Sequence, residues 1–146
     1  MAYYRLLFLD GTAAGLGTVS LELSAFQAAL RTRRGVDLTA PLFAVHAARI
    51  SSKTSYVSSQ RLGRDMRESG VEVALYMSAR DRDRGKNVAL FAPAFARRNP
   101  SALSTWVCTA TRQRVEMSKK DVFRKQHFAF DRNEFEVGGV LPAPAL

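Results

Sequence analysis

Residues 71–91 carry the pattern that most constrains the fold of this chain. Val71-Glu-Val-Ala-Leu-Tyr-Met77 has the alternating character of a strand. Residues 78–86 then hold six charged side chains and Gly85, and Asn87-Val-Ala-Leu-Phe91 returns to β-prone residues. The segment predicts two strands joined by a charged loop, and therefore a fold that contains a β-sheet.

The remaining predicted elements mix strands and helices without regular alternation. Helices are predicted over residues 22–34 and 58–69, because each segment is followed by a glycine that can end a helix. Strands are predicted over the β-prone runs 3–9, 15–21, 41–50, 105–110, 112–117 and 122–130. This order favours a single α+β domain with a mixed β-sheet core and flanking helices over a regular βαβ repeat.

The length and composition of the chain favour one compact domain. The chain has 146 residues, of which 47% are hydrophobic, so it can bury a core. No apolar run approaches the ~20 residues of a membrane span, and the N-terminus lacks a signal-peptide pattern. We expect a domain over residues 1–136 and a loose C-terminal tail over residues 137–146, which are rich in glycine and proline.

Cysteine usage indicates a reducing compartment. Cys108 is the only cysteine, so no intrachain disulfide can form, and we expect a cytoplasmic protein. Its strand-like surroundings favour a packed apolar role over a nucleophilic one. One cysteine with only His46 and His127 does not give the ligand spacing of a structural zinc site.

The net charge makes this a basic protein. It is +9, from 22 Lys and Arg against 13 Asp and Glu. Such a surface attracts polyanions, which include nucleic acids, phosphate-bearing small molecules and acidic proteins. Charge by itself does not choose among these partners.

Several short motifs in the middle of the chain carry a family resemblance. Ser59-Gln-Arg-Leu62 lies on a predicted helix and is followed by Gly70. Tyr76-Met-Ser78-Ala-Arg80 then ends one predicted strand, and Asn87-Val-Ala-Leu-Phe91 forms the next. In this order and at this spacing, the motifs resemble the RES-domain family. Phe8-Leu-Asp-Gly-Thr12 is similar to that family's N-terminal motif.

The resemblance implies a fold similar to the ADP-ribosyltransferases and NAD⁺ as the substrate, with no permanently bound cofactor. Proteins of this family are typically toxins of bacterial toxin–antitoxin pairs. They hydrolyse or phosphorolyse NAD⁺ or transfer its ADP-ribose. A helix-turn-helix antitoxin usually neutralises them, so such a protein is the expected partner.

The same motifs imply site residues. Ser78 matches the family serine and is the expected catalytic residue, although a serine at this point can also cap a turn. Arg80 matches the motif arginine, which would bind the pyrophosphate of NAD⁺. Tyr76, Asn87 and, more weakly, Arg5 are the other expected NAD⁺-binding residues.

The N-terminal half departs from the family pattern. A gapless alignment from Asp10 puts Gly17 where the family often has tyrosine and Ala28 where it has glutamate. Glycine has no aromatic ring and alanine has no carboxylate, so neither residue can replace its counterpart in the family. Glu22 lies on the same predicted helix, about six residues earlier, on a different face.

Two further functions stay open. One is a catalytically degenerate RES-like domain that binds a nucleotide or a protein partner. The other is a nucleic-acid-binding module, in which aromatic residues 106, 123, 128 and 130 would stack on bases beside basic residues 112–125. Core packing is the favoured role for those aromatics. A homo-oligomer is also open, whereas a membrane partner is not expected.

Overall fold

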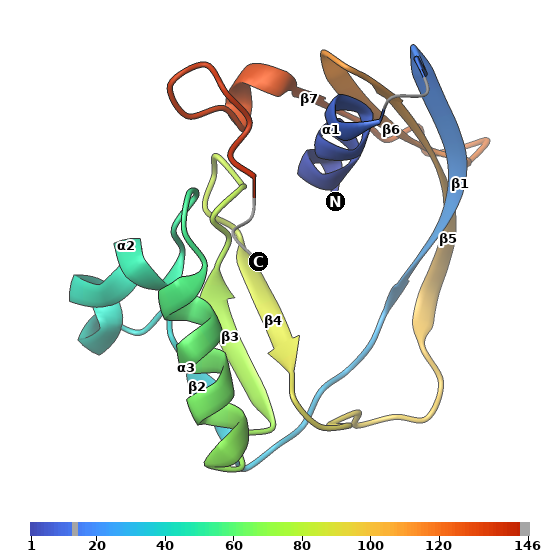
Figure 1. The fold of residues 1–146 in the computed structure, drawn as a ribbon. Helices are drawn as coiled ribbons and strands as arrows, with labels where there is room; N and C mark the ends of the chain where they lie inside the picture. The colour runs from blue at the N-terminus through green and yellow to red at the C-terminus, as the bar shows by residue number, and fades with distance from the viewer. Residues whose placement is uncertain (13–14, 144–146) are drawn as a thin grey trace. The chain divides into compact units, whose positions relative to one another are not determined.

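The computed structural model describes residues 1–12 and 15–143, which form two compact units (Figure 1). Unit 1 comprises Met1–Ala28 and Asn99–Leu141, and unit 2 is built on Ala29–Arg98. Each unit contains helical segments and a β-sheet, which confirms the predicted α+β class. None of the helices within the described ranges is long and apolar enough to span a bilayer.

Unit 1 packs one helix on a four-stranded antiparallel sheet. The helix is α1 (Ala2–Gly11), which contacts β5 and β6. The sheet order is β1-β5-β6-β7, and a short 3-10 helix, η2, follows the last strand. Their bounds are Thr18–Gln27 for β1, Ser101–Thr111 for β5, Arg114–Lys119 for β6, His127–Asp131 for β7 and Arg132–Glu134 for η2.

The core of unit 1 explains why residues 3–9, predicted as a strand, form a helix instead. Tyr3, Leu6 and Leu9 recur at three-residue spacing and are buried together with Cys108 of β5. A strand would place Leu6 and Phe8 on the same face, yet Leu6 is fully buried and Phe8 is 54% exposed. An apolar run this short fits either period, so burial against the sheet decides its conformation.

The predicted helix over residues 22–34 is also wrong, because β1 extends through residue 27. Leu21 and Leu23 are half-buried and alternate with exposed neighbours. Residues 18–25 pair with residues 104–111 of β5, so the sheet satisfies their backbone groups. The predicted strand over 15–21 is therefore only the first part of a longer one.

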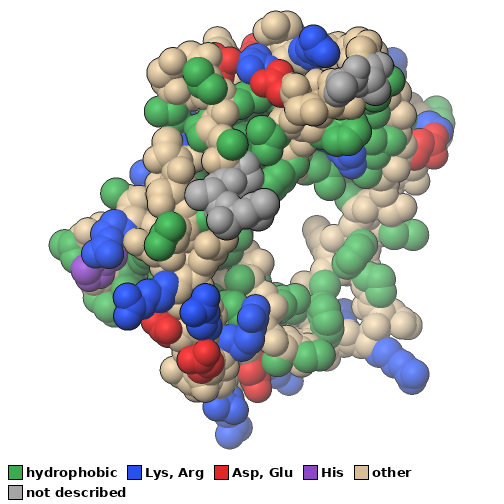
Figure 2. Space-filling view, viewed as in Figure 1, with side chains coloured by type: hydrophobic (Ala, Val, Ile, Leu, Met, Phe, Trp, Pro, Cys, Tyr) green, Lys and Arg blue, Asp and Glu red, His purple; other side chains and the backbone are tan. Residues whose placement is uncertain are grey.

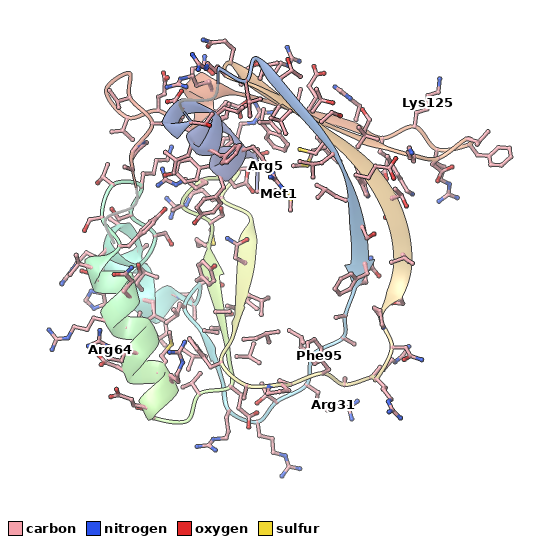
Figure 3. The ribbon with its side chains drawn as sticks, turned by 45° about the vertical axis from the view of Figure 1, so that its right-hand side comes forward. Met1, Arg5, Arg31, Arg64, Phe95 and Lys125 are labelled. Carbon is pink, nitrogen blue, oxygen red and sulfur yellow. The ribbon has the colours of Figure 1, made fainter. Side chains whose placement is uncertain are left out.

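Unit 2 contains a three-stranded mixed sheet, as predicted for the core. Its strands are β2 (Gly35–Asp37), β3 (Val73–Met77) and β4 (Lys86–Leu90). β2 pairs with β3 in parallel, and β3 pairs with β4 in antiparallel orientation. Helix α3 (Val57–Glu68) lies beside the sheet in both ribbon views (Figures 1 and 3). The predicted strands over 71–77 and 87–91 and the predicted helix over 58–69 are confirmed.

Residues 41–50 do not form the predicted strand. They form the 3-10 helix η1 (Pro41–His46) and the short helix α2 (Ala47–Ile50). The Asp37 carboxylate accepts hydrogen bonds from the backbone N–H and the hydroxyl of Thr39, at 2.8 and 2.6 Å, and so turns the chain at the end of β2. Pro41 then starts η1, where its missing N–H costs nothing.

The last three predicted strands are present with shifted ends. β7 begins at His127 rather than at residue 122, because the Asp121 carboxylate accepts hydrogen bonds from the N–H groups of Phe123 and Arg124 and closes a turn there. Leu141, in the expected tail, is buried in the core of unit 1. The domain boundary at residue 136 stays a prediction, and residues 144–146 lie outside the described part.

Candidate functional site

The site residues predicted in unit 2 lie at the end of β3 and in the loop after it. Ser78 follows β3 directly, and its backbone N–H donates to the Gly85 carbonyl at 2.8 Å. Its Oγ accepts hydrogen bonds from the N–H groups of Arg80 and Asp81, at 3.3 and 3.1 Å. Ser78 therefore holds the start of the loop, which is the turn-capping role, and its catalytic role stays a prediction.

The Asp81 carboxylate shapes the remainder of this loop. Its Oδ1 accepts a hydrogen bond from the N–H of Asp83 at 3.0 Å, and its Oδ2 accepts one from the N–H of Gly85 at 2.9 Å. A Cβ atom on Gly85 would lie 2.5 Å from Asp81 Oδ2, so a side chain at this position would displace the Asp81 carboxylate. The loop is thus tied to itself at both ends, and its charged tip stays exposed.

Arg80 is held against the start of α3. Its Nη2 donates a hydrogen bond to Tyr56 Oη at 2.9 Å, and its guanidinium carbon lies 5.8 Å from the centre of the Tyr56 ring. Its Nε and Nη1 atoms are buried. Tyr56 immediately precedes α3, and sequence reasoning missed it, because only its position next to a helix start set it apart.

The hydroxyl of Ser51 connects the end of α2 to the end of β3. Ser51 Oγ donates a hydrogen bond to the carbonyl of Met77, the last residue of β3, at 2.7 Å. Ser51, Tyr56, Ser78 and Arg80, which we call the Arg80 cluster, therefore bring α2, α3 and β3 together. All four are half-buried. A guanidinium group can bind an anionic group, and the hydroxyls of this cluster can orient a sugar hydroxyl.

Tyr76 and Asn87 lie next to this cluster in the sheet. They are register partners across β3 and β4, so their side chains share one face. Tyr76 is half-buried and Asn87 is exposed. Four of the five predicted site residues, Tyr76, Ser78, Arg80 and Asn87, are therefore neighbours within unit 2.

The fifth predicted residue belongs to the other unit. Arg5 lies on α1 in unit 1 and is half-buried. The other four predicted residues belong to unit 2, and the role of Arg5 in binding NAD⁺ stays a prediction.

Glu22, predicted to lie on a helix, does not lie on one. Glu22 lies in β1, opposite Val107 of β5, and forms an ion pair with Lys120. Gly17 precedes β1 and Ala28 follows it, and both are exposed. Within the described residues, no three His, Cys, Asp or Glu side chains gather where they could hold a metal ion.

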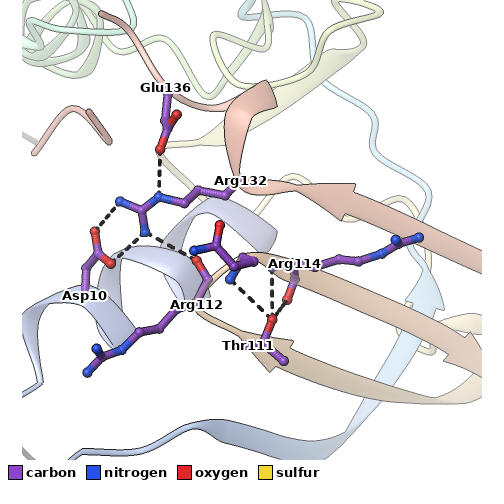
Figure 4. A network of polar contacts seen from close by, with 7 residues as sticks. Asp10, Thr111, Arg112, Arg114, Arg132 and Glu136 are labelled. Carbon is purple, nitrogen blue, oxygen red and sulfur yellow. Dashed lines mark hydrogen bonds and ion pairs between the residues drawn. The ribbon is translucent and has the colours of Figure 1, made fainter. Parts of the chain in front are cut away.

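The Asp-Gly motif of the N-terminal half takes part in a polar network in unit 1 (Figure 4). Arg132 donates to both carboxylate oxygens of Asp10, at 2.6 and 2.7 Å, and its Nε donates to Glu136 at 2.7 Å. Hydrogen bonds from Arg132 hold the pKa of Asp10 below its usual value, and those to Asp10 and Glu136 raise the pKa of Arg132. This Asp10 contact is structural, and sequence reasoning missed Arg132.

The aromatic residues considered for nucleic-acid binding have different environments. Phe130 packs against the core of unit 1, as favoured. Trp106 and Phe128 stack on each other, with ring centres 5.7 Å apart and planes at 27°. Phe123 is 94% exposed at the turn between β6 and β7, so the expectation of core packing is wrong for this residue. Only Phe123 therefore offers a largely free ring.

Comparison with protein families bears on most of the chain. The model of the RES domain matches residues 1–110, and residue 110 is the second-to-last residue of β5. The match covers the Arg80 cluster together with α1 and β1. It extends beyond the sequence motifs that carry the resemblance, the last of which ends at Phe91. No curated protein matches the chain significantly.

Proposed function

Because this chain belongs to the RES-domain family, we propose that it acts on NAD⁺ as the toxin of a toxin–antitoxin pair. The reaction would be hydrolysis or phosphorolysis of the nicotinamide–ribose bond, or transfer of ADP-ribose. The observation that supports this proposal best is the Arg80 cluster, in which a half-buried guanidinium group contacts the Tyr56 hydroxyl, and the Ser51 and Ser78 hydroxyls bind the backbone at the end of β3.

Arg80 would bind the pyrophosphate of NAD⁺. Its Nε and Nη1 atoms are buried, whereas Nη2 has a second N–H beside the one that it donates to Tyr56, so Nη2 would give a charge-assisted hydrogen bond to a phosphate oxygen. The hydrogen bond to Tyr56 restrains the side chain before the ligand arrives, and this lowers the entropy lost on binding. Partial burial also strengthens the attraction to an anion, since the surroundings are less polar than water.

Ser78 would orient the ribose or the nicotinamide. Two backbone N–H groups donate to its Oγ, which positions the oxygen and leaves the hydroxyl hydrogen free to donate to the substrate. Tyr76 and Asn87, which share a face of the adjacent strands, would contact the same ligand. Breaking the nicotinamide–ribose bond develops positive charge on the ribose carbon, and this charge needs a stabilising carboxylate.

The missing carboxylate favours a second candidate function. Residues 17 and 28 carry no acidic group, and Glu22 is already in an ion pair with Lys120. A RES domain without a carboxylate at the family's glutamate position would bind NAD⁺ or a related nucleotide without turning it over. The partner in either case would be a helix-turn-helix antitoxin, to which the basic surface would be complementary.

NAD⁺ consumption by the purified protein, measured beside calorimetric NAD⁺ binding, tests both functions. Ser78→Ala should lower turnover by about 10²-fold, as for loss of one oriented hydrogen-bond donor. Arg80→Gln should weaken NAD⁺ binding, whereas Arg82→Gln, a change in an exposed residue of the same loop, should not.

The outcomes separate the two candidates. Turnover that depends on Ser78 supports the enzyme. Saturable NAD⁺ binding that depends on Arg80, without turnover, supports the binding protein. A folded protein that neither consumes nor binds NAD⁺ contradicts both.

A further inference from the structure

Five arginines gather on two adjoining segments of unit 2, away from the Arg80 cluster in sequence. The two segments are residues 29–34 and 94–98. Leu30 and Phe95 form an antiparallel bridge, and Arg31 N–H donates to the Ala94 carbonyl at 2.9 Å. We call the set the arginine ribbon, and its members are Arg31, Arg33, Arg34, Arg97 and Arg98.

The charge of the arginine ribbon is not neutralised within the chain. All five side chains are exposed, and neither segment contains an acidic residue. Within the described part of the chain, none of the five arginine side chains makes a hydrogen bond or an ion pair, and the backbone N–H of Arg34 donates to the Thr32 hydroxyl at 2.8 Å. The nearby carboxylate of Glu72 accepts a hydrogen bond from Thr32 at 2.5 Å instead. The ribbon is therefore a local concentration of five positive charges facing solvent.

Contacts with the turn after α3 hold Arg34 in place. Arg34 lies against Gly70, at φ +74° in the turn after α3, in the space that a side chain on residue 70 would fill. Its carbonyl also accepts a hydrogen bond from Glu72 N–H at 2.9 Å. The side chain of Arg31 extends away from the backbone in Figure 3. Figure 2 shows Lys and Arg side chains at the lower end of unit 2, with some Asp and Glu side chains between them.

The chemistry of this surface fits a phosphate backbone. All five members are arginines, whose planar fork matches phosphate oxygens. A protein interface usually has several apolar side chains at its centre, whereas Phe95 is the only large apolar side chain exposed within the described segments 29–34 and 94–98. We propose that the arginine ribbon binds the phosphodiester backbone of nucleic acid without reading its sequence.

Salt-dependent binding tests this proposal on the full-length protein. Fluorescence anisotropy would measure the Kd for a labelled DNA duplex and for an RNA duplex of the same length, between 50 and 200 mM KCl. Each phosphate contact contributes about 0.9 to the slope of log K against log salt on duplex DNA. Arg31→Gln with Arg33→Gln should therefore lower that slope by about 1.8 and weaken binding to every sequence alike.

Two control pairs remove the same charge elsewhere. Arg61→Gln with Arg64→Gln lies on α3 of the same unit, and Arg124→Gln with Lys125→Gln lies beside the exposed Phe123. Both pairs should leave most of the slope in place. An equal loss of slope in either control would overturn the assignment to the ribbon. Displacement of the duplex by polyglutamate at equal charge would show that the surface prefers acidic proteins and would overturn the nucleic-acid proposal.

Discussion

Asp10 and Arg132 are 122 positions apart and form a bidentate ion pair in unit 1, with N–O distances of 2.6 and 2.7 Å. The pair fastens the end of α1 to the segment that follows β7, and Arg132 is further held by Glu136. The RES-domain match covers residues 1–110, so it includes Asp10 but not Arg132.

We expect Asp10→Asn to lower the free energy of unfolding by about 1 kcal/mol at neutral pH, because one side of a charged, half-exposed pair is lost. The pKa of Asp10 is lowered in the folded protein, so its stabilisation is complete above its unfolded pKa of about 3.9. The difference between variant and wild type should therefore vanish as the pH falls through the lowered value. Urea unfolding at pH 7 and pH 3 measures this difference, and Asp83→Asn, in an exposed loop, serves as the control.

Leu6→Ala should destabilise unit 1 strongly, by roughly 2–5 kcal/mol, because Leu6 is fully buried. Phe8→Ala should have an effect below about 1 kcal/mol, because Phe8 is 54% exposed. Thermal or chemical unfolding of the two variants tests the helical conformation of α1. Similar losses for both would indicate a strand, in which residues 6 and 8 share a face.

Ser78→Ala should cost only about 1 kcal/mol of stability, from two lost hydrogen bonds at a half-buried turn. Its effect on NAD⁺ turnover should be far larger if the hydroxyl contacts substrate. Ser78→Thr keeps the hydroxyl and should retain the turn. A loss of turnover no greater than the loss of folded protein would assign Ser78 to the turn alone.

Tyr56→Phe should weaken NAD⁺ binding about 5- to 10-fold, because it removes the hydroxyl that positions Arg80 and keeps the ring beneath the guanidinium. Isothermal titration measures the Kd. Arg80→Lys in the same assay separates the contribution of the positive charge from that of the guanidinium geometry, since lysine keeps the charge and lacks the planar set of N–H donors. An unchanged Kd for Tyr56→Phe would show that Arg80 needs no support.

Gly85→Ala should loosen the loop after β3. A Cβ atom there would lie 2.5 Å from Asp81 Oδ2, so the carboxylate would move and lose its hydrogen bonds to the loop backbone. We expect faster amide exchange in residues 78–86 with little change in the melting temperature. Unchanged exchange in this loop would contradict the role given to Asp81.

The sequence determined the local structure from α3 to β4 and the family, because each residue pattern there is confined to neighbouring positions. Alternation, a terminal glycine and the Tyr76–Arg80 motif are sufficient to predict a helix, two strands and the loop between them. The site residues on these elements are close in sequence, and the register of β3 with β4 makes them neighbours in space.

Only the tertiary structure decided the N-terminal half and the partners of the site residues. Residues 3–9 and 22–27 fit both a helical and a strand period, and burial against β5 or pairing with it selects one of the two. Tyr56 reaches Arg80 across 24 positions, and Arg132 reaches Asp10 across 122. No local pattern encodes such contacts, because they arise when distant segments share the same sheet edge or core.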